Sequence, residues 1–311
     1  MQINRIYNGD CLELAKTLPD NFINCCITSP PYFQLRRYTD SDLEIGLEET
    51  PEQYIEKLVV LFRELRRALR PDGTLWVNIG DSYNVSGNGI GSNKGNPHSI
   101  ETGNATKIKG LKPKDLIGVP WMLAFALRAD GWWLRQEIIW SKGNPMPASV
   151  KDRCTTSHEQ IFLLSKSRNY YFDYEAIREP CSEANIKDFK GRKTMNNLGG
   201  GVFANVRPDL SKRGRDDYMS EDFKRNKRSV WEVNLKPSKD GHIAAFPQKL
   251  IVPMIEAGCP KGGIVLDPFI GSGTVASVAS RLERKYIGFE LNAEYCKIIE
   301  KKLNREVGLW R

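Results

Sequence analysis

The chain has 311 residues, with 46 Lys and Arg against 38 Asp and Glu, and its formal net charge is +8. At 40% hydrophobic and 27% charged residues, the composition is that of a globular protein rather than a disordered or fibrous one. No run of about eighteen apolar residues occurs, and the N-terminus lacks the apolar segment of a signal peptide. We therefore expect a cytoplasmic protein without a membrane span, whose positive charge permits a polyanionic partner.

Cysteine and histidine give no sign of a disulfide framework or a metal site. Seven Cys is an odd number, and no CxxC pair occurs. The three histidines, His98, His158 and His242, are scattered along the chain rather than clustered. The sequence therefore predicts reduced thiols and no bound metal.

Hydrophobic patterning predicts an α/β fold with a parallel sheet. Residues 22–27 form an apolar run without polar alternation, which is typical of a strand buried on both faces. A helix follows, with Thr50 as its cap, Pro51 at its first position and Gln53 completing a capping box. With the next strand, these elements form a βαβ unit. In chain order the pattern predicts strands over 3–7, 22–27, 74–79, 133–140, 160–165, 264–267 and 286–290, and helices over 12–18, 50–69, 121–127, from 244, from 274 and ending at 303.

Two segments depart from this pattern. Residues 84–110 are rich in Gly, Asn, Ser and Lys and nearly lack large apolar residues, which predicts a long mobile loop. Residues 181–230 hold twelve Lys or Arg and seven Asp or Glu, so five of the eight excess positive charges fall in fifty residues. The densest part, residues 224–228, is either a solvated face or a surface that contacts nucleic-acid phosphates.

The first candidate site lies in residues 264–274. An apolar strand ends at Asp267, and a Gly-containing turn leads directly into a helix. In open α/β folds such a turn lies at the carboxyl edge of the sheet, where ligands bind, and Glu290 at the end of the next strand is placed to bind two ribose hydroxyls. There is no GxGxxG and no phosphate-binding Lys, so the pattern favours a nucleoside without phosphates. An ordinary strand-to-helix turn is the alternative.

The second candidate site is Thr28-Ser29-Pro30-Pro31-Tyr32, directly after the buried strand. Two prolines fix φ and remove two backbone donors, which leaves rigid carbonyl acceptors. Ser29 adds a hydroxyl acceptor, and Tyr32 adds a ring that can stack on a base. Such a pocket suits an exocyclic amino group, because hydrogen bonds from the amine localise its lone pair. Taken alone, the motif would be interpreted as a Pro-rich turn.

Together these motifs resemble the amino-group DNA methyltransferases that use S-adenosylmethionine. Residues 28–32 look like their catalytic S/D/N-P-P-Y/F motif, and residues 267–274 are similar to their DPFxGSGT cofactor motif. Residues 242–247 resemble the HxxxFP element and residues 8–10 the short acidic motif at the adenine ring, and residues 144–147 in the middle of the chain also fit the family pattern. The catalytic motif precedes the cofactor motif, as in the family's β group.

The resemblance implies a Rossmann-like methyltransferase sheet, mostly parallel with helices on both faces, plus an irregular basic insert. The target base would be held by Ser29, Pro30, Pro31 and Tyr32. The cofactor would be bound by Asp10 at the adenine, Glu290 at the ribose, and Phe246, Asp267, Phe269, Gly271, Ser272, Gly273 and Thr274 along the cleft. The expected organisation is a catalytic half over 1–83 and 114–180, a mobile loop over 84–113, a target-recognition region over 181–240 and a cofactor-binding half over 241–311.

The reaction implied is direct in-line methyl transfer to a base flipped out of double-stranded DNA. Ser29 at the first motif position resembles the cytosine-N4 enzymes, whereas adenine-N6 members of this order usually carry Asp, so we expect cytosine N4 with adenine N6 as the alternative. A cytosine-C5 enzyme needs a Pro-Cys nucleophile, and the single Pro-Cys, Pro180-Cys181, lies in an irregular stretch.

Two other interpretations remain open at this stage. Relatives with an Asn-Pro-Pro-Tyr motif methylate RNA or protein amides, although Ser29 and the basic insert favour DNA. A DNA-binding module with a vestigial cleft is a non-enzymatic rival. The family also allows a cognate restriction endonuclease as a partner. The recognition sequence and the oligomeric state do not follow from the sequence.

Overall fold

The computed structural model describes residues 1–39, 41–84, 108, 110–145, 147–184, 186–187, 223–235 and 246–308. The chain divides into two compact units, one made of Met1–Phe172 with Ser229–Arg311 and the other of Asp173–Arg228. Most of the predicted loop over 84–113 and most of the predicted recognition region over 181–240 lie outside the described residues.

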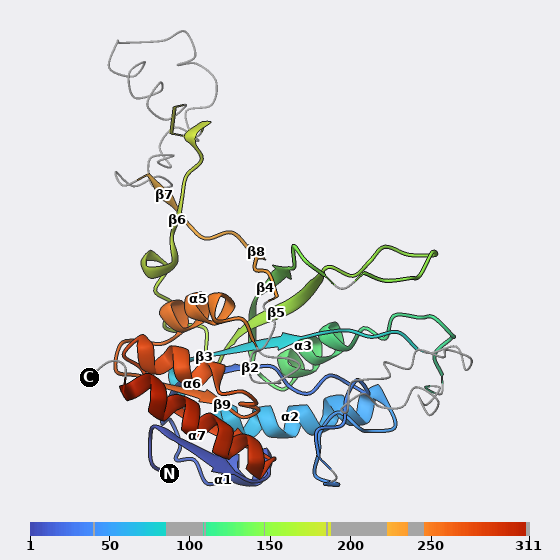
Figure 1. Ribbon diagram of the computed structural model, residues 1–311, viewed down its shortest axis with the longest axis horizontal. Coiled ribbons are helices and arrows are strands. Elements are labelled where there is room, and N and C mark those ends of the chain that lie inside the picture. The colour runs from blue at the N-terminus through green and yellow to red at the C-terminus, as the bar shows by residue number, and fades with distance from the viewer. Residues whose placement is uncertain are drawn as a thin grey trace. The chain divides into compact units, whose positions relative to one another are not determined.

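Among the described residues, an eight-stranded sheet forms the centre of the larger unit, in the order β1-β10-β9-β2-β3-β5-β4-β8 (Figure 1). Neighbouring strands pair in parallel except around β5, which is antiparallel to both β3 and β4. The predicted mostly parallel sheet is therefore confirmed. The strands are β1 (Arg5–Asn8), β2 (Ile23–Thr28), β3 (Leu69–Ile79), β4 (Trp133–Ser141), β5 (His158–Ser165), β8 (Val230–Glu232), β9 (Ile264–Asp267) and β10 (Lys285–Glu290).

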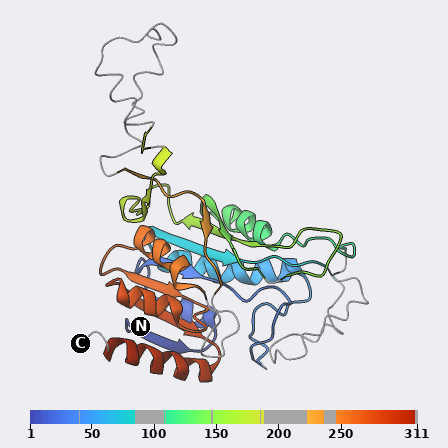
Figure 2. The ribbon, with the colours of Figure 1, turned by 45° about the horizontal axis from the view of Figure 1, so that its top comes forward.

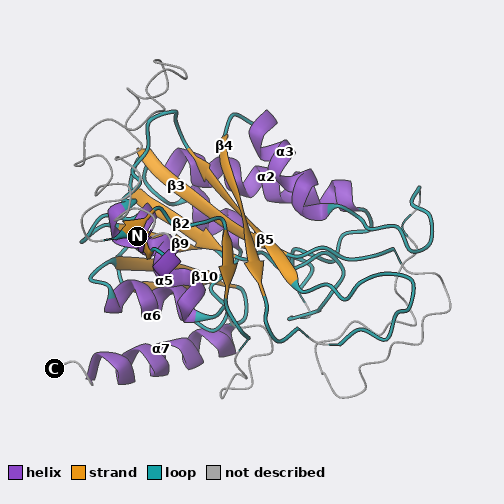
Figure 3. Ribbon diagram, turned by 90° about the horizontal axis from the view of Figure 1, so that it is seen from above, coloured by secondary structure: helices purple, strands orange, loops and turns teal. Residues whose placement is uncertain are grey.

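Helices cover both faces of this sheet, as predicted (Figure 3). Helix α2 packs against α1 and α3 on one face, while α5 and α6 pack against the strands from the other, where α7 adjoins α6 and the strands β1 and β10. The helices are α1 (Cys11–Lys16), α2 (Pro51–Ala68), α3 (Val119–Ala129), α5 (Gln248–Gly258), α6 (Thr274–Arg281) and α7 (Ala293–Gly308).

Helix α2 begins where its sequence signals place it. The Thr50 hydroxyl accepts a hydrogen bond from the Gln53 backbone N–H, and the Gln53 side-chain oxygen accepts one from the Thr50 N–H, both at 3.2 Å. These two bonds form the predicted capping box. The apolar face of the helix, including Tyr54, Leu58 and Phe62, is fully buried and anchors α2 on the sheet.

The two ends of the described chain meet in the sheet. Strand β1 pairs in parallel with β10, with Asn8 opposite Glu290. Figure 2 shows the blue N-terminal strand beside the dark red helix α7. Next to them, the early strand β2 pairs with the late strand β9 through Cys25 and Cys26. Segments more than 200 residues apart thus pair side by side in one half of the sheet.

The smaller unit contains a short 3₁₀ helix, Glu175–Ile177, and an antiparallel pair of two-residue strands, β6 (Glu179–Pro180) and β7 (Lys224–Arg225). The Glu179 carboxylate accepts hydrogen bonds from Arg225 at 3.1 Å and Arg228 at 2.6 Å. The first bond joins β7 to β6, and the second ties the basic segment, residues 224–228, to the same carboxylate.

Within the part of the chain that the structure describes, no helix combines the length and apolar character needed to cross a bilayer. The same residues contain no group of three His, Cys, Asp or Glu side chains arranged to hold a metal ion.

Candidate active site

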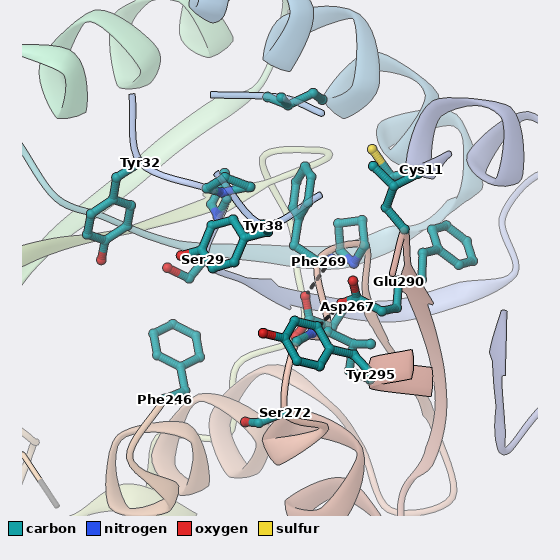
Figure 4. Close-up of a pocket in the computed structure, with 18 of the residues that line it drawn as sticks. Cys11, Ser29, Tyr32, Tyr38, Phe246, Asp267, Phe269, Ser272, Glu290 and Tyr295 are labelled. Atoms are coloured by element: carbon teal, nitrogen blue, oxygen red, sulfur yellow. Dashed lines mark hydrogen bonds between the residues drawn. The ribbon is translucent and has the colours of Figure 1, made fainter. Parts of the chain in front are cut away.

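A cavity of about 590 Å³ lies at the carboxyl edge of the sheet, and both sequence motifs line it. Strands β2 and β9 are neighbours, and the proline loop follows β2 while the Gly-containing turn follows β9. In Figure 4, Ser29 and Tyr32 lie at one end of this pocket, and Glu290 and Tyr295 lie at the other. The fold therefore joins the two candidate sites into one.

The proline loop is held by hydrogen bonds from neighbouring elements. The Tyr54 hydroxyl of helix α2 donates to the Pro31 carbonyl oxygen at 2.7 Å. The Tyr32 hydroxyl donates to Glu159 Oε2 at 2.5 Å, and its ring lies so close to Gly80 that a Cβ there would stand 2.4 Å from Tyr32 Cε2. Burial, followed by the nearby Glu159, raises the pKa of Tyr32 well above its ordinary value, so this hydroxyl stays protonated.

The turn after β9 has the backbone that its glycines permit. Gly271 and Gly273 have φ values of +51° and +74°, in the left-handed region. A Cβ on Gly273 would also stand 2.5 Å from Ile299 Cγ2 of helix α7, so only glycine lets α6 and α7 approach at this position. Gly271 lines the cavity, whereas Gly273 does not.

Glu290 presents a fixed carboxylate to the cavity. Its Oε2 accepts a hydrogen bond from Gly271 N at 3.0 Å, and its Oε1 accepts one from Asn292 N at 2.9 Å. A carboxylate has about four acceptor positions, so each oxygen keeps capacity for one more hydrogen bond. Burial raises the pKa of Glu290, and the backbone donors partly oppose this rise. Two adjacent acceptors suit the two hydroxyls of a ribose.

Asp267 lies beneath the turn and is 3% exposed. Its Oδ1 accepts hydrogen bonds from the Thr28 hydroxyl at 2.8 Å and from Phe269 N at 3.0 Å. Burial raises its pKa to about 7, against the lowering effect of these two donors. Asp267 therefore shapes the turn and also ties it to the end of β2.

The structure brings nearly all of the predicted site residues to this cavity. Asp10 lines it and also caps helix α1, because its side chain accepts a hydrogen bond from Glu13 N at 2.9 Å. Of the predicted HxxxFP element, Phe246 lines the cavity, and residues 242–245 lie outside the described residues. The predicted residues that line it are Asp10, Ser29, Pro30, Pro31, Tyr32, Phe246, Asp267, Phe269, Gly271, Ser272, Thr274 and Glu290.

Several residues of the cavity were not predicted. Asn78, Lys142 and Glu159 form a polar group beside Ser29, and Tyr38 and Tyr295 line the cavity as well. Asn78 lies near the carboxyl end of β3, a position that could have been noted as a strand-end polar group. Tyr38 and Lys142 lie in loops, Glu159 in strand β5 and Tyr295 in helix α7, and the sequence does not reveal that these elements meet at the cavity.

This arrangement supports transfer chemistry on a flat, amine-bearing ligand. Acceptors on the Ser29–Tyr32 loop face the same cavity as a ribose-suited carboxylate, and no histidine is among the described lining residues. A hydroxyl without a neighbouring base is a poor covalent nucleophile. The site is therefore suited to hold two ligands against each other rather than to form a covalent enzyme intermediate.

Comparisons with known proteins point to one family. A family model described as DNA methylase matches residues 23–301. Type II methyltransferase M.Cfr9I of Citrobacter freundii is 44% identical over 302 residues, which cover 97% of this chain and 88% of that protein. Type II methyltransferase M.SmaI of Serratia marcescens is 42% identical over 305 residues, which cover 97% and 91%.

Solved structures share the fold. The cytosine-N4-specific PvuII DNA methyltransferase matches with a TM-score of 0.62 at 19% identity, covering 99% of this chain and 92% of that one. A Thermus thermophilus protein, described as a putative DNA modification methylase and complexed with S-adenosyl-L-methionine, matches with a TM-score of 0.59 at 21% identity, covering 98% and 94%.

Proposed function

The chain belongs to the DNA methylase family, and from this premise we propose that it methylates the exocyclic N4 of cytosine in duplex DNA. The observation that carries the proposal is the single cavity lined by both the Ser29–Tyr32 loop and the turn after Asp267. A methyl transferase for an amino nitrogen needs its acceptor and its donor in one enclosed space.

S-adenosylmethionine is the methyl donor and supplies, when bound, an electrophilic methyl group on a sulfonium sulfur. Glu290 would hold the ribose hydroxyls with the acceptor capacity left on its two carboxylate oxygens. Asp10, Phe246 and Phe269 line the cavity, where Asp10 would contact the adenine amino group and the two rings would bound the cleft. The remaining residues assigned to the cofactor are Asp267, Gly271, Ser272, Gly273 and Thr274, which shape the turn.

The target base lies at the other end of the cavity. Ser29 Oγ and the Pro30 carbonyl oxygen accept the two amine protons, which localises the nitrogen lone pair and directs it into the cavity. Tyr32 stacks on the base, and Pro31 keeps the loop rigid. Because the cavity lies between loops at the edge of the sheet, a base reaches it only after flipping out of the duplex.

Cytosine is favoured over adenine by the hydroxyl residue at position 29. Cytosine-N4 enzymes resemble this chain at that position, whereas the adenine-N6 members of the same motif order usually carry Asp. Adenine N6 is the second candidate, since a serine oxygen accepts a hydrogen bond from either amine. RNA or a protein amide is a more distant alternative.

DNA recognition falls to the basic region over 181–240, between the catalytic and cofactor halves. Lys and Arg bind phosphates, and other side chains read base edges. A restriction endonuclease of the same specificity would be the partner in a restriction-modification system, and a cytoplasmic location would bring the enzyme to its DNA.

The experiment that tests this function is nucleoside analysis of DNA methylated by the purified protein, with single-molecule sequencing to map the site. We expect N4-methylcytosine at one short sequence. N6-methyladenine would replace the proposed base with the second candidate, and unmodified DNA with modified RNA would overturn the proposal.

A further inference from the structure

Beside Ser29, polar side chains form one hydrogen-bonded network with Glu159 at its centre. Glu159 Oε2 accepts hydrogen bonds from the Tyr32 hydroxyl at 2.5 Å and from Asn78 Nδ2 at 3.1 Å. Its other oxygen, Oε1, pairs with the Lys142 ammonium group, and both side chains of this pair are only 15% exposed. All of these side chains line the cavity.

Glu159 reaches this position because β5 is antiparallel. Its neighbours end at the carboxyl edge of the sheet, whereas β5 begins there, with Glu159 opposite Trp140. A carboxylate that starts a reversed strand is thereby placed beside the proline loop, 127 residues away in the chain. Glu159 has no part in the proposed binding of the cofactor or of the target base.

The network fixes the direction of each hydrogen bond. A carboxylate only accepts, so the Tyr32 proton and one Asn78 amide proton point to Glu159. The second Asn78 amide proton points to the Gln160 carbonyl oxygen at 3.1 Å. Since both protons of Nδ2 have acceptors, the orientation of the amide is set, and Oδ1 faces Tyr32 at 3.2 Å and Ser29 Oγ at 3.5 Å.

On the side facing away from the cavity, the Ser29 hydroxyl consequently faces hydrogen-bond acceptors. Asn78 Oδ1 offers lone pairs there, and so does the Tyr32 oxygen, whose own proton is directed to Glu159. A hydrogen bond from Ser29 lowers the pKa of Tyr32, against the larger raising effects of burial and Glu159. Serine has a single hydroxyl proton, so a proton directed inward leaves only lone pairs facing the cavity.

We propose that Glu159 is a positioning residue that leaves the Ser29 hydroxyl able only to accept hydrogen bonds from the cavity. The site therefore admits an amino group on the target base and rejects a keto oxygen. The inference rests on the proposed function, because it concerns the base held at Ser29. Cytosine and adenine present amine protons to Ser29, whereas their keto counterparts, uracil and hypoxanthine, present lone pairs. Facing acceptors repel each other, and this repulsion provides the discrimination.

Glu159→Gln reverses the direction of hydrogen bonds in the network and keeps the size of the side chain. Lys142 takes the amide oxygen of the new side chain, and the amide NH₂ faces Tyr32 and Asn78. The Tyr32 proton then turns towards Asn78 or Ser29, and the Ser29 hydroxyl becomes free to donate into the cavity. A keto oxygen on the base can then accept a hydrogen bond from Ser29, which the wild-type site does not offer.

The test is binding of duplexes in the presence of S-adenosylhomocysteine, so that no methyl transfer is needed. One duplex carries the base mapped as the methylation target, and the other carries its keto counterpart, uracil or hypoxanthine. The measured quantity is the ratio of the two dissociation constants. The keto base creates a mismatch in the duplex, but the mismatch is the same for every variant, so it cancels when the ratios of variants are compared. We expect Glu159→Gln to reduce the preference for the amino base by about tenfold, the scale of one hydrogen bond.

Ser29→Ala provides the matched comparison, since it removes the group through which Glu159 acts. It should reduce the same preference, and adding Glu159→Gln to it should change the ratio no further. Glu64→Gln, which alters an ion pair with Arg67 on helix α2, should leave the ratio at its wild-type value. Asn78→Leu removes the acceptor next to Ser29 and is a second route to the same loss.

An unchanged ratio in both Glu159→Gln and Asn78→Leu, with S-adenosylhomocysteine still bound at wild-type affinity, overturns the inference and leaves the proposed function standing. So does a Glu159→Gln effect that persists in full on the Ser29→Ala background. A wild-type protein that methylates no base overturns the proposed function, and the inference with it.

Discussion

Thr28 and Asp267 lie 239 residues apart in the chain and are joined by a buried hydrogen bond of 2.8 Å from the Thr28 hydroxyl to Asp267 Oδ1. Thr28 ends strand β2 directly before the proline loop, and Asp267 ends β9 directly before the Gly-containing turn. The bond therefore fixes the proline loop relative to the Gly-containing turn.

Asp267 gives the protein a pH-dependent stability. Burial raises its folded pKa to about 7 from an ordinary value of 3.8, so the folded state holds the proton more tightly than the unfolded chain does. The stabilising contribution is then complete below the unfolded pKa and is lost as the pH rises through about 7. The unfolding free energy of the wild type, measured against Asp267→Asn by urea denaturation, should fall between pH 5 and 8.

Asp152→Asn serves as the control, since Lys114 lowers the pKa of the exposed Asp152. Its difference from the wild type should show no fall over this pH range. A pH-independent difference between the wild type and Asp267→Asn would contradict the raised pKa.

Ser29→Ala and Tyr32→Ala should separate transfer from cofactor binding. Each removes a proposed contact to the target base, so single-turnover methyl transfer should slow by about a hundredfold or more. Binding of S-adenosylmethionine, measured by calorimetry, should stay at the wild-type level. Full activity in both variants would remove the loop from the mechanism.

Glu290→Gln should impair cofactor binding instead. The change removes an acceptor and places amide protons against Gly271 N or Asn292 N, which already donate to this position. We expect at least about a tenfold loss of S-adenosylmethionine affinity. Glu283→Gln, which replaces an exposed partner of Lys261, should bind normally. Equal affinities in the two variants would show that Glu290 does not hold the ribose.

Gly80→Ala should disturb Tyr32 alone. The new Cβ would stand 2.4 Å from Tyr32 Cε2, so the ring must move. Methyl transfer should slow by about tenfold or more, because a small displacement of a positioning group is costly. Adding Gly80→Ala to Tyr32→Ala should cause no further loss of rate. A further loss would mean that Gly80 acts on the backbone rather than on the ring.

The basic segment should account for part of the salt dependence of DNA binding. Replacing Lys224 and Lys227 with Gln should reduce the slope of log K against log salt by about two. Replacing Lys261 and Lys297 with Gln gives a matched loss of two charges elsewhere and should leave the slope unchanged. If the two double variants behave alike, residues 224–228 are only a solvated face.

Local signals in the sequence predicted much of the fold. Strand β9 has the predicted bounds, and the capping box of α2 is formed by the predicted pair, Thr50 and Gln53. The ends of other elements differ from the prediction where contacts with neighbouring elements determine them. Strand β3 begins at Leu69, five residues before the predicted start, because Ile23 of β2 pairs with it there. Helix α5 begins at Gln248, after Pro247.

The polar network beside Ser29 could not be predicted in the same way. The apolar pattern over 160–165 predicts a strand but does not give its direction, because alternation is the same in parallel and antiparallel strands. Only the antiparallel pairing of β5 brings Glu159 to Tyr32 and Asn78. The short strand β8, which pairs with β4 through Trp231, has too few residues to show a pattern.

The most direct test of the account is a crystal structure of the protein with S-adenosylhomocysteine and a duplex that contains the mapped site. The account predicts the ribose hydroxyls on the Glu290 carboxylate, a flipped base with its amino group on Ser29 Oγ and the Pro30 carbonyl, and the cofactor sulfur facing that nitrogen. A cofactor bound away from Glu290, or a target base that remains stacked in the duplex away from Ser29, would contradict it.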